Sequence, residues 1–110
     1  MIVDLGARGK IVTREAKTLE QILDKNNAPK YIEYLSLDTE GNELDILQVF
    51  PFDKYEFGVM TIEHNAQVGQ AYQDRRELMV ALLTSKGYVR SREVSCDDWY
   101  INPRRIKNGK

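Results

Sequence analysis

Two short, densely apolar segments separated by one helix-length segment constrain the fold of this chain most. Residues 31–38 and residues 57–63 are too rich in apolar side chains for strands with one face in water. Their apolar side chains are those of Ile32, Tyr34, Leu35 and Leu37 in the first segment and of Val59, Met60 and Ile62 in the second. Between them, residues 44–50 have the spacing of an amphipathic helix that ends at Pro51. This order predicts two parallel strands joined by a right-handed crossover and covered by helices on both faces.

Further helices are predicted on both sides of this unit. Thr18 and Gln21 have the spacing of a capping box, which begins a helix that ends near Lys25. After the second apolar segment, residues 67–86 predict a long amphipathic helix. Gly87 follows this helix and suits its C-terminal cap.

Two closing strands are expected at residues 88–94 and 99–102, joined by a turn. The first 17 residues read as an irregular segment in which residues 10–13 suit a short strand. The expected fold class is therefore α/β: a partial doubly wound sheet, mostly parallel, with a C-terminal antiparallel hairpin. The 110 residues predict one domain, made of the N-terminal segment (1–17), an α/β core (18–103) and a basic tail (104–110).

The amino-acid composition of the chain limits the kinds of molecule that it is expected to bind. The net charge of -1, from 16 basic and 17 acidic residues, provides no general attraction to nucleic acid or to an anionic membrane. Cys96 is the single cysteine, which rules out an internal disulfide and suits a reducing compartment. The sequence contains no apolar run near the roughly 20 residues of a membrane span and no signal-peptide pattern. We therefore expect a cytoplasmic domain without nucleic-acid or membrane partners.

The most distinctive motif spans the first apolar strand and the helix after it. It reads Tyr34-Leu35-Ser36-Leu37-Asp38-Thr39-Glu40-Gly41-Asn42-Glu43-Leu44-Asp45-Ile46-Leu47. A strand that ends in Asp, followed by x-Glu-Gly-x-Glu and a helix with Leu-x-x-Leu, resembles the FkbM methyltransferase family. Three flanking blocks resemble family segments in the same order: residues 18–23, residues 61–65, and residues 82–88 with 97–101. The resemblance covers about residues 15–103.

This resemblance implies the C-terminal half of a Rossmann-like, S-adenosylmethionine-dependent domain that methylates a hydroxyl of a small-molecule acceptor. In the family, a glycine-rich strand-to-helix turn in the N-terminal half holds the cofactor. Residues 1–9 resemble that turn superficially, but the helix that begins after Thr18 leaves no room for the second and third strands. S-adenosylmethionine is thus implied for the complete family domain, while this chain alone is expected to bind it weakly or not at all. The alternative function is a non-catalytic oligomerisation or interaction module derived from that fold.

The expected site lies at the carboxyl ends of the two apolar strands, where open α/β sheets bind their ligands. Asp38, Thr39 and Glu40 follow the first strand, and Glu63, His64 and Asn65 follow the second. The resemblance implies that Asp38 and Glu40 line this rim. His64 suits a base that accepts the proton of the acceptor hydroxyl, because histidine exchanges its proton near neutral pH. We predict Asp38, Glu40 and His64 as catalytic residues and Thr39, Glu63 and Asn65 as further residues of the rim.

These side chains also have structural interpretations. Asp38 and Thr39 suit the N-terminal cap of the next helix, and Glu40 and Glu43 favour its positive end. His64 equally suits a hydrogen-bonded strand end. No metal site is predicted, because the acidic residues and His64 lack the fixed spacing of a ligand motif. Cofactor-binding residues are not identified in this chain.

The edge of the first apolar strand predicts a partner. In the complete fold, residues 31–38 would pair on their outer side with another strand. An open apolar edge recruits strands from other chains. We therefore expect a homo-oligomer through the exposed sheet edge, with residues 1–17 as the alternative cover.

Overall fold

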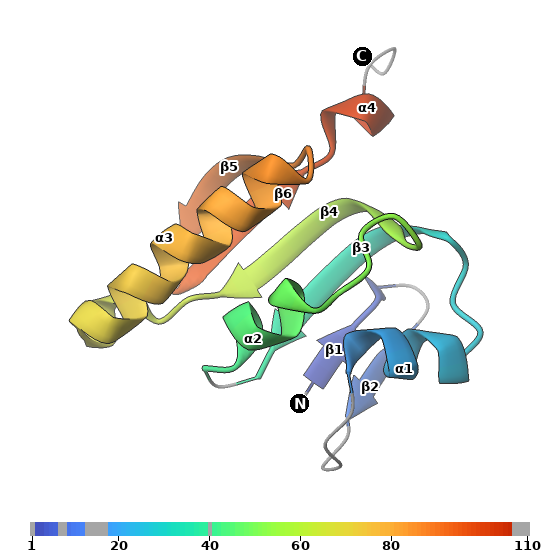
Figure 1. Ribbon diagram of the computed structural model, residues 1–110, viewed down its shortest axis with the longest axis horizontal. Helices are drawn as coiled ribbons and strands as arrows, with labels where there is room; N and C mark the ends of the chain where they lie inside the picture. Colours follow the sequence, from blue (N-terminus) through green and yellow to red (C-terminus); the bar gives the residue numbers. More distant parts are fainter. Residues whose placement is uncertain (1, 7–8, 13–17, 40, 107–110) are drawn as a thin grey trace.

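The computed structural model describes residues 2–6, 9–12, 18–39 and 41–106. In chain order the elements are β1 (Ile2–Asp4), β2 (Lys10–Val12), α1 (Leu19–Lys25), β3 (Tyr31–Asp38), α2 (Glu43–Gln48), β4 (Glu56–Glu63), the short 3-10 helix η2 (Ala66–Val68), α3 (Gln70–Ser85), β5 (Val89–Val94), β6 (Asp97–Ile101) and α4 (Pro103–Ile106). The six strands form one sheet, against which α1, α2 and α3 pack (Figure 1).

The sheet is mixed, with the strand order β2-β1-β3-β4-β6-β5. β3 and β4 pair in parallel, whereas the other four neighbouring pairs of described strands are antiparallel. The expectation of a mostly parallel, doubly wound sheet is therefore wrong. The β3-α2-β4 crossover and the closing β5–β6 hairpin are present as predicted.

The first strand accounts for much of this difference. β1 runs antiparallel to β3, with Val3 opposite Leu37 and both side chains buried. The chain then turns at Gly6, whose φ of 64° is the left-handed conformation that favours glycine, and returns as β2. A short turn joins strands that pair antiparallel, so this hairpin adds two antiparallel strands to the sheet. Strand β1 of this hairpin also pairs with the edge of β3 that was expected to be unpaired.

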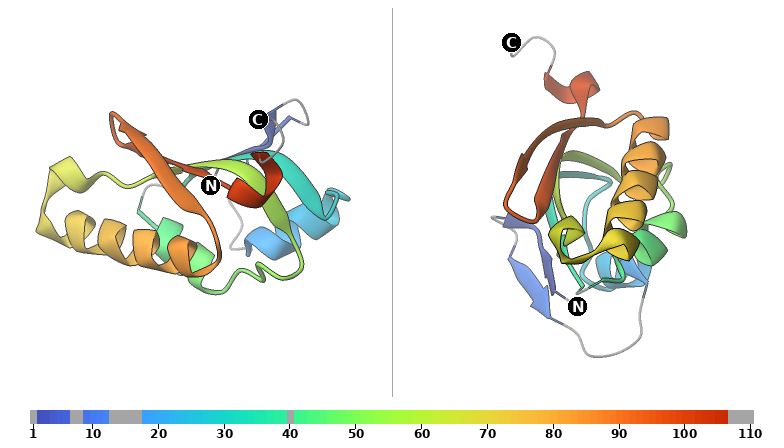
Figure 2. Two further views of the ribbon diagram at one scale, coloured as in Figure 1. Left: turned by 90° about the horizontal axis from the view of Figure 1, so that it is seen from above. Right: turned by 90° about the vertical axis from the view of Figure 1, so that its left-hand side faces the viewer.

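Helices α1, α2 and α3 all lie on one face of the sheet, and none of the three covers the other face (Figure 2). Leu35 and Leu37 of β3 are buried on the helical side. Tyr34 lies on the other side, half-buried, with its hydroxyl 3.1 Å from Oγ1 of Thr61. A tyrosine ring tolerates partial exposure because its hydroxyl remains hydrogen-bonded. The dense apolar pattern of this strand therefore did not require helices on both faces, and that expectation is also wrong.

Local signals in the sequence were more accurate. The capping box of α1 is confirmed: the Gln21 N–H donates to Oγ1 of Thr18 at 3.1 Å, and the Thr18 N–H donates to Oε1 of Gln21 at 2.9 Å. The long helix predicted for residues 67–86 is divided into η2 and α3, because Gly69 between them is extended. Gly87 follows α3 with a φ of 96°, as expected for a helix end.

The core lies between the helices and the sheet. Its largest fully buried side chains are those of Tyr88, Tyr100, Phe57, Leu19, Leu23, Ile32, Leu35, Leu37, Leu47, Met60, Ile62 and Leu83. Burial of each large apolar side chain stabilises the fold by about 1.5–3 kcal/mol. Among the described residues, no helix combines the length and the apolar composition that a bilayer crossing requires.

Candidate functional site

The parallel pairing of β3 and β4 brings two predicted site residues together. Leu37 stands next to Ile62 in the register, so that Asp38 and Glu63 end the two strands side by side. One carboxylate oxygen from each of Asp38, Glu63 and Glu43 lies within 4.8 Å of the others. The expected acidic rim is therefore present at the carboxyl end of the parallel pair.

Glu43 organises the loop that follows β3. One of its carboxylate oxygens accepts from the Thr39 N–H at 2.8 Å, and the other accepts from the Gly41 N–H at 3.1 Å. The hydroxyl of Thr39 accepts from the Asn42 N–H at 3.1 Å. Both oxygens of Glu43 are thus used by the backbone, and Thr39 acts as a local cap. The capping interpretation fits Thr39 and Glu43, and it leaves the carboxylate of Asp38 available to the rim.

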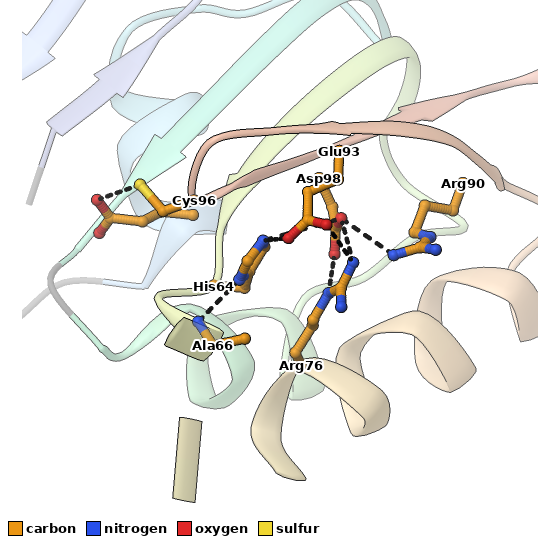
Figure 3. A network of polar contacts seen from close by, with 8 residues as sticks. His64, Ala66, Arg76, Arg90, Glu93, Cys96 and Asp98 are labelled. Atoms are coloured by element: carbon orange, nitrogen blue, oxygen red, sulfur yellow. Dashed lines mark hydrogen bonds and ion pairs between the residues drawn. The ribbon is translucent and has the colours of Figure 1, made fainter. Parts of the chain in front are cut away.

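Glu63 has the most perturbed carboxyl group of the rim. Burial, followed by a side-chain hydrogen bond with Asp38 and then by the charges of Asp38 and Glu43, raises the pKa of Glu63 to about 7. Its Oε1 is buried and accepts no hydrogen bond from the described residues. Its Oε2 lies 3.9 Å from the thiol sulfur of Cys96 (Figure 3). Glu63 therefore exchanges its proton near neutral pH, a property that the sequence analysis had assigned to a histidine.

Asp97 extends the acidic row to a third strand. It stands opposite Glu63 in the antiparallel pair of β4 and β6. Burial, followed by the charge of Asp38, raises the pKa of Asp97 as well. Asp97 was expected in a turn and not at this position. The turn between β5 and β6 is tight because Ser95 has a positive φ of 56°, a conformation that a serine in the sequence does not indicate.

His64 lies away from this row, on the helical side of the sheet. Its side chain is almost fully buried, and Nδ1 accepts from the Ala66 N–H at 2.9 Å. Its Nε2 lies 2.8 Å from a carboxylate oxygen of Glu93 and 3.9 Å from one of Asp98 (Figure 3). The nitrogen lone pair that a base would use is therefore occupied by the backbone. The structure does not bring His64 together with Asp38 and Glu63.

Asn65 and Glu40 are the remaining predicted site residues. Asn65 follows His64 in the left-handed conformation, with a φ of 51°. Its side chain favours the ionised form of Glu63 and so opposes part of the rise in that pKa. Asn65 therefore lies beside Glu63, and its role as a rim residue stays a prediction. Glu40 lies outside the described residues.

A second group of possible metal ligands consists of His64, Glu93 and Asp98. Arg76 contacts both acidic members, at 3.5 Å from Glu93 and 2.8 Å from Asp98. Its positive charge balances the carboxylates and fills the place that a cation would take. This group is better described as an ion-pair network than as a metal centre.

The described residues do not form a cradle for S-adenosylmethionine. Such a cradle needs a glycine turn that leads from a strand into a helix beside the rim. Here the Gly6 turn leads into β2, and the Leu5 N–H donates to the Gly9 carbonyl at 2.8 Å. Because Ile2 stands opposite Asp38 and Asp4 opposite Ser36, the turn lies farther from the rim, beside Tyr34. The geometry therefore does not fit the cofactor to this chain's N-terminal glycines.

The carboxyl ends of parallel strands, where this acidic rim lies, are the place at which open α/β sheets bind their ligands. The model of the methyltransferase FkbM domain matches residues 3–90. This match spans most of the chain, and the chain therefore belongs to the FkbM methyltransferase domain family. No curated protein and no solved structure shows significant similarity to the chain.

Proposed function

We propose that this chain provides the acceptor side of an S-adenosylmethionine-dependent O-methyltransferase. The family match supports methyl transfer as the reaction class. The observation that carries the proposal is the Glu63 carboxyl group, whose pKa is raised to about 7 at the rim of the parallel strands. A group with a pKa near the working pH is well suited to accept a proton.

The rim residues have separate roles in this proposal. Glu63 accepts the proton of the acceptor hydroxyl and takes the role that the sequence analysis gave to His64. Asp38 orients the hydroxyl and keeps the pKa of Glu63 high through its charge. Glu40 is retained as a site residue through the family motif. Thr39 and Glu43 hold the loop in place through backbone hydrogen bonds.

In this proposal the residues that the structure describes do not hold the cofactor. S-adenosylmethionine is the methyl donor that the family implies, but the hairpin at Gly6 does not have the form of its binding turn. We therefore expect weak cofactor binding by this chain alone. The same observation favours the second candidate function, a non-catalytic interaction module that retains the fold.

A methyl-transfer assay with labelled S-adenosylmethionine separates these two functions. The chain is supplied with millimolar cofactor, which compensates for weak binding, and with a panel of small hydroxyl-bearing acceptors. We expect transfer that falls by about 10²–10⁴-fold in Glu63→Gln, the usual effect of losing a general base. Glu33→Gln, which alters an exposed side chain of β3, is the matched control and should leave the rate unchanged. Equal rates in both variants would contradict the role of Glu63, and no transfer by the unmodified chain would favour the interaction module.

Calorimetric titration with S-adenosylmethionine tests the assignment of the cofactor. The proposal expects no binding in the micromolar range. Micromolar affinity that is lost in Gly6→Val would show that the N-terminal glycines do hold the cofactor.

A further inference from the structure

We propose that two copies of this chain associate through β5, which pair antiparallel about a two-fold axis. β5 pairs with β6 on one side and faces no described strand on the other. All six of its residues, Val89–Val94, are exposed. The other outer strand, β2, has three residues and offers a shorter edge. Since β1 covers the edge of β3, β5 is the longest open edge among the described strands.

A β-bulge determines which side chains of β5 share a face. In a regular strand, residues three positions apart point to opposite faces. Here the register shifts between Arg90 and Arg92, so that Arg90 stands opposite Tyr100 and Glu93 stands opposite Asp98. Tyr100 and Asp98 are two positions apart in β6 and share the helical face. The bulge therefore places Arg90 and Glu93 on the same face.

The bulged strand is complementary to itself. If the second copy runs antiparallel and the axis passes between Ser91 and Arg92, Arg90 of each copy stands opposite Glu93 of the other. In the same register Val89 stands opposite Val94, and Ser91 stands opposite Arg92. The two copies of Arg92 therefore flank the axis, where each guanidinium lies over its own Trp99 ring at 5.3 Å and the like charges oppose part of the gain. Both valines lie on the helix-free face, because they pair with Ile101 and Asp97 in β6. A two-fold axis perpendicular to the sheet keeps like faces together and makes each favourable pair occur twice.

The side chains of this edge are free enough to make these contacts. Arg90 donates one N–H to Asp98 at 3.2 Å, and its side chain remains 40% exposed. A guanidinium has five N–H donors, so donors remain for a second carboxylate. Glu93 is 43% exposed; its carboxylate lies 2.8 Å from His64 and 3.5 Å from Arg76, and its two oxygens have further lone pairs with which to accept from a second guanidinium. Val89 and Val94 are 49% and 47% exposed, so pairing would remove apolar surface from water.

Charges and bulges on an edge strand usually prevent unspecific strand addition. In β5 the charges and the bulge would also favour a second copy of β5 in a single register. A shift of the second strand by one residue breaks both Arg90–Glu93 pairs. Opposite charges that face each other across strands stabilise the pairing, whereas like charges oppose it. The strand therefore fits a second copy of itself better than an unrelated strand.

Disulfide formation tests the register directly. In a Cys96→Ser background, Val89→Cys and Val94→Cys are combined. Within one strand these positions are about 17 Å apart, too far for a disulfide. Across the proposed pair the same positions face each other at about 4.5–5.5 Å between Cβ atoms, which oxidation can bridge after a small shift.

We expect a covalent dimer from the double variant on a non-reducing gel. Each single variant is a matched control, because in this register position 89 lies about 17 Å from position 89 of the other copy. The same separation holds for position 94. Covalent dimers that form equally well in the single variants, or none in the double variant, would overturn the register.

Sedimentation equilibrium tests association without cross-linking. We expect a reversible dimer whose fraction falls as salt rises, because the Arg90–Glu93 pairs are partly exposed to solvent. The variant Val89→Lys/Val94→Lys should be monomeric, since four added positive charges would meet at the interface. Val49→Lys/Val68→Lys, at positions 67% and 65% exposed outside β5, should still dimerise. Circular dichroism confirms that each variant is folded. A chain that stays monomeric at the highest soluble concentration in low salt would overturn the proposal, whether or not methyl transfer is observed.

Discussion

Arg76 of α3 and Asp98 of β6 form a two-point ion pair that joins the long helix to the closing hairpin. Nε of Arg76 lies 2.8 Å from Oδ2 of Asp98, and Nη2 lies 3.0 Å from Oδ1 (Figure 3). Arg90 of β5 adds a third contact to the same carboxylate at 3.2 Å. The Asp98 side chain is 2% exposed, so its charge depends on these partners.

Replacement of Asp98 by asparagine should destabilise the fold strongly. The change keeps the shape of the side chain but leaves Arg76, whose side chain is 15% exposed, without its anionic partner. Loss of one member of a buried pair costs about 3 kcal/mol or more in free energy of unfolding. Urea denaturation followed by circular dichroism measures this loss.

Lys54→Ala is the matched control for that experiment. Lys54 pairs with Glu20 and Asp24 at 2.9 Å, and all three side chains are 39–45% exposed. Exposed pairs contribute little to stability because water screens them. A loss in Lys54→Ala as large as that in Asp98→Asn would contradict the importance given to the buried pair.

The stability of the fold should depend on pH through Glu63. Its pKa is raised from 4.5 to about 7, so the folded chain holds this proton more tightly than the unfolded chain does. Between these values the unfolded chain loses the proton first, and the contribution of Glu63 to stability falls as pH rises through the window. Glu63→Gln should therefore become more stable relative to the unmodified chain as pH rises from 4.5 to about 7.

Urea midpoints of both chains across this pH range provide the measurement. Glu33→Gln controls for the simple loss of one negative charge on the neighbouring strand. A difference between Glu63→Gln and the unmodified chain that stays constant with pH would show that the folded state does not raise the pKa of Glu63.

Gly58 should not tolerate a side chain. A Cβ at this position would lie 2.5 Å from the Tyr31 hydroxyl and 2.8 Å from the carbonyl oxygen of Glu33 in the adjacent strand. The backbone contact cannot be relieved by rotation of a side chain, so Gly58→Ala should destabilise the fold by about 1–3 kcal/mol. Gly69→Ala, with no neighbouring atom within 4 Å, is the control. Equal thermal midpoints for the two variants would contradict this packing.

The cover of β3 by β1 depends on Val3. This side chain is fully buried opposite Leu37. Val3→Asp would place an unpaired charge there and should release β1, which exposes the apolar edge of β3. We expect faster hydrogen exchange within Ser36–Asp38, the residues of β3 that pair with β1, together with increased light scattering. Unchanged exchange throughout these three residues would show that β1 does not protect this edge.

Elements defined by local chemistry could be predicted from the sequence. The capping box at Thr18, the end of α3 before Gly87 and the β5–β6 hairpin depend on neighbouring residues alone. The direction in which β1 pairs with β3 depends on contacts between residues more than 30 positions apart, such as Val3 and Leu37. No periodicity in a single strand specifies such a pairing, and this is why the parallel, doubly covered sheet was wrong.

The candidate site likewise could be predicted in part from the sequence. Asp38 and Glu63 could be placed together because parallel neighbours end at one rim. The sequence favoured His64 as the base because of its side-chain type, but the face to which each side chain turns could not be predicted. Consecutive strand residues point to opposite faces, so one position separates a side chain of the rim from one buried beneath α3.

Because β1 pairs antiparallel with β3, the N-terminal end of β1 lies next to the acidic rim. Ile2 lies opposite Asp38, so a polypeptide joined ahead of β1 leaves the domain beside Asp38 and Glu63. Helix α4 is remote from the rim, because it follows β6, which runs back along β4 until Ile101 stands opposite Val59. A fused tag or neighbouring domain would therefore shield the acidic row when attached before β1 and leave it accessible when attached after α4.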